Sequence, residues 1–148
     1  MASRGIRNDN PLNIRHGKSQ WMGMRERQTD RQFVQFTARV YGYRAAFVLI
    51  RGYIAKGKDT IGTIIARWAP SSDGNNTQAY IGFVSRTTGI DAGRTLRWED
   101  RDDLVAVVRS MAQMESGIIE DKAIIEEAYE ASLPSPLPNR EREQDTNN

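Results

Sequence analysis

The stretch Asp100–Gly117 constrains the fold most, because it has the pattern of one long amphipathic helix. At about 100° per residue, its apolar side chains fall on one broad face and its polar side chains on the other. The apolar face holds Leu104, Val105, Val107, Val108, Met111, Ala112 and Met114, and the polar face holds Asp102, Arg109, Ser110 and Gln113. Aspartates at its start and Gly117 at its end suit the two ends of a helix. A helix with so wide an apolar face needs a core to pack against.

Glu115 interrupts this pattern. The series Leu104, Val108, Met111 and Glu115 steps along one side of the helix, which places the carboxylate on the apolar stripe. The helix dipole disfavours a negative charge in the last turn, and burial raises the pKa of a carboxyl group. A carboxylic acid that stays protonated near neutral pH suits general acid catalysis on a glycosidic oxygen. The alternative is that Glu115 lies at the edge of the core and pairs with an arginine.

Four other segments have helical periodicity, and one has the pattern of a short hairpin. The helices are expected at Tyr41–Ala55, from a cap at Asp59 or Thr60 to Trp68, from a cap at Asn76 or Thr77 to Gly89, and at Ile118–Ala131. The hairpin is expected at Trp21–Phe36. We therefore predict a mainly α domain with a small β-hairpin (α+β) and about five helices over residues 1–132. Residues 133–148 are rich in proline and then wholly polar, which predicts a flexible tail.

Composition excludes several classes of protein. A chain of 148 residues with 39% hydrophobic content suits one domain with its own core. No apolar run is long enough to cross a membrane, and the start lacks the apolar segment of a signal peptide. The chain has no cysteine and one histidine, which gives no basis for a disulfide, a thiolate or a metal site, and no cofactor is implied.

Charge is distributed unevenly along the chain. Residues 1–58 contain twelve Lys and Arg against three acids, which indicates a polyanionic target such as nucleic acid or the bacterial wall. The alternative is a solvated basic face with no such partner. No expected helix presents a stripe of Arg and Lys, and no nucleic-acid-binding motif is present, so nucleic acid is the least favoured partner.

Two resemblances extend this interpretation. Seven pieces together resemble small phage and prophage proteins that are usually labelled virion structural or lysozyme-like, namely SRGIRNDNPLNIR, WMG, Asp30 with FVQF, YGYRAAFVLIRGYI, DTIGTIIARWAP, NNTQAYI and MESG. The chain also resembles bacterial peptidoglycan glucosaminidases and their lysozyme-like relatives. In those enzymes a helix ends in Glu-Ser-Gly, and an Asn-rich segment, a hairpin and a motif ending in tyrosine follow. The matching segments here are Met114–Gly117, Asn10–Arg15, Trp21–Phe36 and Thr77–Tyr80.

The order of these segments differs from that of the enzymes, because the glutamate element follows the others. A circular permutation explains the difference, since domain termini often lie close together. The resemblance therefore implies that Glu115 packs beside Asn8–Ile14. The Phe-Gly-Ile of the enzymes is replaced by Leu12-Asn13-Ile14, which changes the fine shape of any groove.

The second resemblance implies a lysozyme-like fold in which Glu115 is the general acid. Asp30 or Glu26 is then the second carboxylate, although either can instead pair with a nearby arginine such as Arg25, Arg27 or Arg31. With no second acid in place, the resemblance permits a lytic transglycosylase, in which one glutamate acts as acid and then as base. The sugar groove is expected to be lined by Asn10, Asn13, Trp68, Thr77 and Tyr80.

The function expected from these points is cleavage of peptidoglycan glycan strands by a phage or prophage lytic protein. Such a protein acts from the virion, or from the host cytoplasm after release or injection to the wall, and it can contact other virion proteins. The alternative is a non-catalytic virion structural or wall-binding protein of the same fold.

Overall fold

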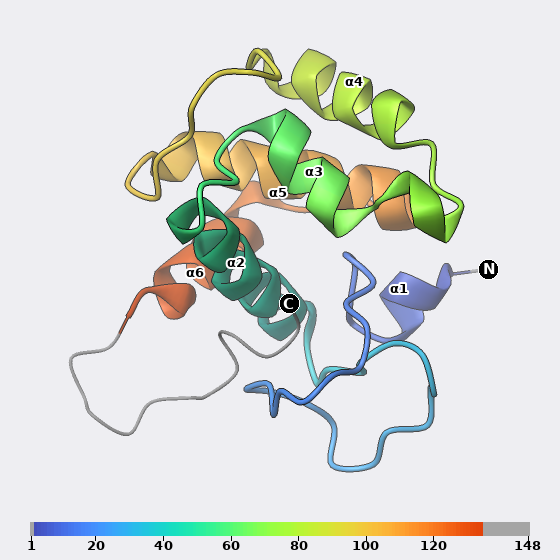
Figure 1. Ribbon diagram of the computed structural model, residues 1–148. Coiled ribbons are helices and arrows are strands. Elements are labelled where there is room, and N and C mark those ends of the chain that lie inside the picture. Colours follow the sequence, from blue (N-terminus) through green and yellow to red (C-terminus); the bar gives the residue numbers. More distant parts are fainter. Residues whose placement is uncertain (1, 135–148) are drawn as a thin grey trace.

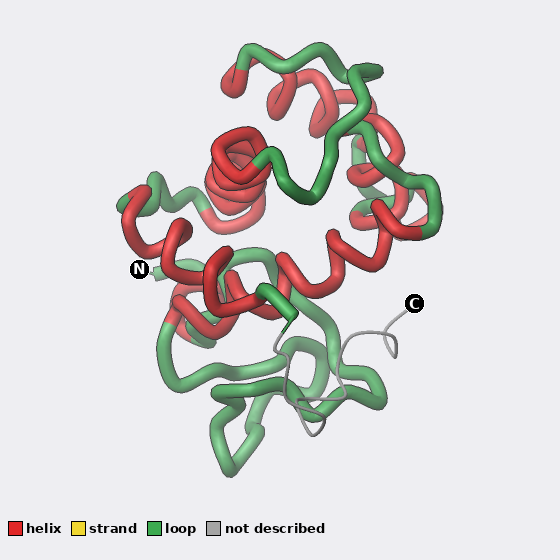
Figure 2. The backbone as a smooth tube through the Cα atoms, turned by 90° about the vertical axis from the view of Figure 1, so that its left-hand side faces the viewer, coloured by secondary structure: helices red, strands yellow, loops and turns green. Residues whose placement is uncertain are grey.

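The computed structural model describes residues 2–134, and these are mainly helical, as predicted (Figure 1). The six α-helices are α1 (Arg4–Arg7), α2 (Arg39–Ala55), α3 (Ile61–Trp68), α4 (Thr77–Thr88), α5 (Arg101–Ser116) and α6 (Lys122–Ser132). A short 3-10 turn, η1 (Ser71–Asp73), lies between α3 and α4. The described residues form no β-strand (Figure 2).

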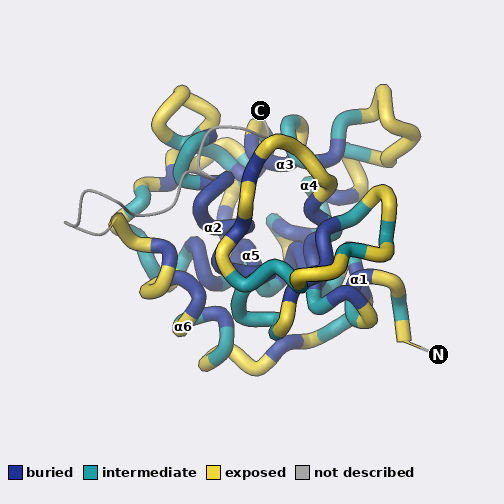
Figure 3. Tube along the Cα trace, turned by 90° about the horizontal axis from the view of Figure 1, so that it is seen from below, coloured by how far each residue is buried: buried dark blue, intermediate teal, exposed yellow. Residues whose placement is uncertain are grey.

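The core is organised around α2, which packs against α3, α5 and α6. Its buried side chains include Tyr43, Phe47 and Ile50, which have no exposed surface. Complete burial of one such side chain stabilises a fold by roughly 1.5–3 kcal/mol. Buried positions gather in the middle of the molecule, on α2 and α5 (Figure 3).

Helices α3, α4 and α5 form a second group, in which α4 packs against the other two. Because α5 also packs against α6 and α2, it connects the two groups. Most of the loop-rich segment that joins α1 to α2 lies at the opposite end of the molecule from α4, while its first part rises toward α3 (Figure 1). Short α1 lies against the C-terminal end of α5.

Helix ends follow the residues that predict them. The α5 helix begins after Asp100 and ends at Gly117, whose φ of 72° is the left-handed conformation that glycine adopts readily. Thr60 caps α3 and Asn76 caps α4, each through a side-chain oxygen that accepts from a backbone N–H in the first turn. Gly89 ends α4, again as predicted.

Two predictions about α5 and α6 are wrong in detail. Met114 is 38% exposed, so the apolar face of α5 does not extend to it, and Ser110 is buried because its hydroxyl bonds to that of Thr87. The last helix starts after Asp121 rather than at Ile118, because the Asp121 side chain accepts from a backbone N–H and caps it there.

The expected hairpin at Trp21–Phe36 is also not formed. Two isolated antiparallel bridges occur, and Met24 pairs with Phe36 in one of them. The side chains of Gln28 and Gln35 bond to backbone groups in this segment, so they replace the strand-to-strand bonds of a ladder. Buried Trp21 and Phe36 anchor an irregular loop instead of two strands.

The predicted flexible tail at 133–148 lies outside the described residues, apart from its first two positions. Among the described residues, no helix combines the length and the apolar character that crossing a membrane requires.

Candidate functional site

Glu115 lies in the last turn of α5, where the buried stripe of Leu104, Val108 and Met111 reaches the surface. Its side chain is half-buried. The stripe directs the carboxylate toward the neighbouring segments rather than into open solvent. Position and local pattern therefore agree with the sequence prediction.

Two neutral donors hold this carboxylate. The side-chain amide of Asn13 donates to Oε1 at 3.1 Å, and the hydroxyl of Tyr80 donates to Oε2 at 3.0 Å. Asn13 comes from the loop before α2, and Tyr80 comes from α4. The predicted packing of Glu115 beside the segment Asn8–Ile14 is thus confirmed. Among residues 2–134, Glu115 forms no ion pair with an arginine, the alternative that the pattern left open.

Burial raises the pKa of Glu115 above its ordinary value, and it outweighs three opposing contributions. The hydrogen bonds from Asn13 and Tyr80 lower the pKa because they stabilise the charged form, and so does the positive charge of Arg15. A carboxyl group in such surroundings keeps its proton to higher pH than an exposed one. The arrangement suits a proton donor.

The residue after Glu115 locks the end of α5 to the N-terminal segment. The hydroxyl of Ser116 donates to the Pro11 carbonyl oxygen at 2.7 Å, and the hydroxyl of Ser3 donates to the Ser116 carbonyl oxygen at 3.1 Å. Gly5 faces this contact so closely that a Cβ there would lie 2.1 Å from Ser116 Oγ. Sequence reasoning missed both α1 and Gly5, since nothing in the pattern SRGIRN indicates a close approach to a segment more than a hundred residues away.

The two asparagines predicted to line a groove differ in exposure and in what their side chains contact. Asn13 is half-buried at a φ of 54°, a left-handed conformation that asparagine tolerates, and its side chain reaches Glu115. Asn10 has no exposed surface, and its amide bonds internally to Ile14 and to the carbonyl oxygen of Val34. Asn10 therefore holds the loop in shape and cannot contact a substrate, which corrects its predicted role.

Asp30 is enclosed by donors rather than open to a ligand. Both oxygens accept from Arg4 at 2.7 Å, and further bonds come from Asn8 and from the backbone N–H groups of Gln32 and Phe33. The hydrogen bonds from Arg4 hold the pKa of Asp30 well below its usual range, although burial opposes them. Such a carboxylate is a fixed anion that organises the loop.

The ion pairs of this loop differ from those expected. Asp30 pairs with Arg4, and Arg25 pairs with Asp9 at 3.0 Å. Glu26 is exposed. Neither predicted second carboxylate has a hydrogen bond that links it to Glu115.

Two surface hollows involve predicted groove residues. One, of about 530 Å³, is lined in part by Asn13 and Trp68. The other, of about 650 Å³, is lined by amide and hydroxyl side chains, which are Ser71, Asn75, Asn76, Thr77 and Gln78, and we call it the amide hollow. The end of α3 contributes to both hollows. Of the predicted groove residues other than Asn10, Asn13 and Tyr80 contact Glu115, while Trp68 lines the first hollow and Thr77 the second.

The site contains little that could hold a metal. Within residues 2–134, no three side chains of the types His, Cys, Asp and Glu gather at metal-binding distances. The expectation that no cofactor takes part stays a prediction.

Comparison with known proteins finds a similar phage protein. No protein-family model matches this chain. Over 120 residues it is 42% identical to Protein P5 of Pseudoalteromonas phage PM2, an alignment that covers 78% of this chain and 72% of that protein. The relative comes from a phage, in agreement with the phage origin that the sequence motifs imply.

Proposed function

The chain belongs to the family of Protein P5 of Pseudoalteromonas phage PM2, and from this premise and the surroundings of Glu115 we propose a phage-type lytic protein that cleaves peptidoglycan glycan strands. The proposed fold is lysozyme-like, and the helix that carries the glutamate follows the other matching segments in the chain instead of preceding them. The observation that carries the proposal is the half-buried Glu115 carboxyl group between two neutral donors, Asn13 and Tyr80.

In the first step, protonated Glu115 gives its proton to the oxygen that leaves as the glycosidic bond breaks. Burial favours the protonated form before this step. As the proton departs, negative charge develops on the two carboxylate oxygens. Asn13 and Tyr80 already point a donor at each oxygen, so no large rearrangement is needed to stabilise that charge.

The second step is proposed to use the same residue. Because Asp30 is enclosed by Arg4 and backbone donors, it is poorly placed to activate water or to form a covalent intermediate. The Glu115 carboxylate can instead take a proton from a hydroxyl of the sugar itself, as that oxygen bonds to the anomeric carbon. The product is then an anhydro sugar, no water is consumed, and Glu115 recovers its proton, as in a lytic transglycosylase.

The test is the clearing of purified peptidoglycan by wild-type protein and by Glu115→Gln across about pH 4 to 8. Glutamine keeps the shape of the side chain and can still accept from Asn13, so the variant should stay folded. Glu127→Gln is the matched control, because Glu127 is exposed on α6. We expect clearing to be abolished only in Glu115→Gln. Mass spectrometry of the released fragments then separates anhydro ends from hydrolysed ends, which differ by one water.

A second candidate is a non-catalytic virion structural or wall-binding protein. It is favoured by the way in which Glu115 ties together α4, α5 and the N-terminal loop, a role that needs no chemistry. A wild-type protein that clears no type of wall but sediments with it would support this candidate. Clearing by Glu115→Gln at the wild-type rate would remove Glu115 from the catalytic role.

A further inference from the structure

The hollow that contains Asn13 and Trp68 has an unusual set of charges. Among the residues that the structure describes, its lining includes the cations Arg15, Lys18 and Arg67 and no acidic side chain. The single histidine of the chain, His16, also lines it. We call this site the cationic hollow.

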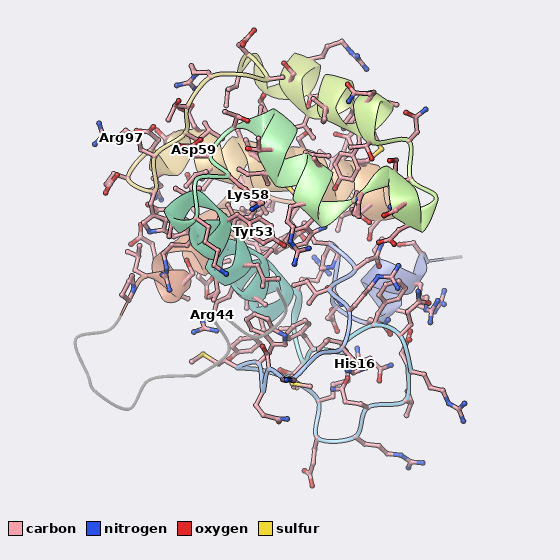
Figure 4. The ribbon with its side chains drawn as sticks, in the orientation of Figure 1. His16, Arg44, Tyr53, Lys58, Asp59 and Arg97 are labelled. Carbon is pink, nitrogen blue, oxygen red and sulfur yellow. The ribbon has the colours of Figure 1, made fainter. Side chains whose placement is uncertain are left out.

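Aromatic rings form part of its wall. The guanidinium of Arg67 lies 5.5 Å from the centre of the Tyr53 ring, and Tyr53 packs edge to face against Trp68 at 6.2 Å. Figure 4 labels two lining residues, His16 on the N-terminal loop and Tyr53 on α2. The guanidinium of Arg15 lies 5.5 Å from the Phe33 ring, and a ring face orients an arginine without neutralising its charge.

The cationic hollow adjoins the acid. Asn13 lines it and at the same time donates to Glu115 Oε1, so one side chain belongs to both. Arg15 lies near enough for its charge to act on the Glu115 carboxyl group. The amide hollow differs, because its lining has neutral polar side chains and no charged one among the described residues. The two hollows therefore differ in charge, and the cationic one is the one that shares a residue with the acid site.

We infer that the cationic hollow binds a carboxylate of the peptide stem that a wall sugar carries, so that strands are bound with their stems in place. This inference rests on the proposed function and names its substrate more closely. Arginine and lysine are the usual partners of carboxylates, and arginine can bind both oxygens at once. A volume of about 530 Å³ is in the range of small-ligand sites, and it suits a short peptide segment beside a sugar ring on Trp68.

The experiment measures binding without turnover, in the Glu115→Gln background. Binding is compared for intact peptidoglycan and for glycan strands whose stems an amidase has removed. Both are stripped of phosphate-bearing polymers and coupled to beads, because strands without cross-links are soluble and do not sediment alone. The test variant adds Arg15→Gln and Lys18→Gln, two exposed positions of the cationic hollow. The matched control adds Arg86→Gln and Lys56→Gln, which are exposed elsewhere and change the net charge equally.

We expect the test variant to lose roughly tenfold in affinity for intact peptidoglycan and little for stem-free strands, while the control pair changes neither. An equal loss on both strands, or the same loss in the control pair, overturns the inference. The amidase leaves a free lactyl carboxylate on each muramic sugar and both substrates are free of phosphate, so a loss confined to intact peptidoglycan assigns the binding to carboxylates of the stem. If the stem-dependent binding is found but wild type clears no wall, the proposed function fails and the ligand assignment stands. If wild type clears walls but binds both strands equally, only the inference fails.

Discussion

Replacing Gly5 with alanine is expected to force α1 away from the end of α5. The added methyl group would lie 2.1 Å from Ser116 Oγ, which is 1.3 Å short of the 3.4 Å at which ordinary contact begins. The other neighbours leave no room for it to move, because the Asn10 carbonyl oxygen lies at 3.0 Å and Asn13 Oδ1 at 3.1 Å. Either the backbone shifts or the Ser116 hydroxyl turns away from Pro11.

Both responses weaken the fold. Overpacking of this kind costs about 1–3 kcal/mol, and a lost hydrogen bond costs about 1 kcal/mol. Because α1 spans only four residues, the helix preference of alanine offsets little of this. We expect the free energy of unfolding to fall by about 1–3 kcal/mol. A shift of roughly 1 Å between Asn13 and Glu115 is expected to slow wall clearing on the order of 10²-fold.

Thermal unfolding and the clearing rate measure the two effects. Gly62→Ala is the control, since its Cβ would meet the Ala92 carbonyl oxygen at 3.5 Å and Thr60 Oγ1 at 3.8 Å, both ordinary contact distances. Adding Ser116→Ala to Gly5→Ala removes the nearest clashing atom, so the two substitutions together should cost less than the sum of each alone. A Gly5→Ala protein with wild-type melting temperature and wild-type clearing would refute the close packing described for this contact.

Three further outcomes are expected. Tyr80→Phe removes a donor that lowers the pKa of Glu115, so the alkaline limb of the clearing rate against pH should move to higher pH. The maximal clearing rate should fall by about tenfold. An unchanged pH profile would contradict a role for this hydroxyl. Burial of Glu120 raises its pKa, but the hydrogen bonds from Arg39 and Tyr43 and the charge of Arg39 together outweigh burial and lower it. Glu120→Gln should therefore lower the free energy of unfolding by about 3 kcal/mol at neutral pH. The difference in stability between wild type and variant should narrow as pH falls through the pKa of Glu120 in the folded protein, which chemical denaturation at several pH values measures. Asp30→Asn should lower the melting temperature but leave the pH profile of clearing unchanged, and a shifted profile would restore Asp30 as a catalytic acid.

Helices α2 to α6 could be predicted from the sequence because their signals are local, whereas short α1 was missed. Apolar spacing located α5, and residues such as Thr60, Asn76 and Gly117 marked helix ends through bonds within one turn. The missing hairpin shows the limit of such signals. The apolar residues Phe33, Val34 and Phe36 indicate a strand, and only the folded loop shows that the side chains of Gln28 and Gln35 take the backbone bonds.

The candidate site was also predicted in part, but the prediction came from a family resemblance and not from local signals. Contact between Glu115 and Asn13 follows from the resemblance to wall enzymes rather than from any local pattern. Asn10 and Asn13 look alike in the sequence, and the left-handed backbone at Asn13 decides which of them faces the acid. The partner of Asp30 was missed because Arg4 lies 26 residues away, and long-range ion pairs leave no trace in residue spacing.

The contacts that complete the acid site join residues separated by 102, 105 and 113 positions along the chain. Contacts between such distant positions form late in folding, because a long loop must close before they contribute. On the ribosome, Asn13 and Pro11 emerge long before the residues that they bind. A nascent chain therefore holds no assembled acid site until α5 has been synthesised and has folded against the N-terminal segment, which delays the proposed lytic activity until synthesis has passed Ser116.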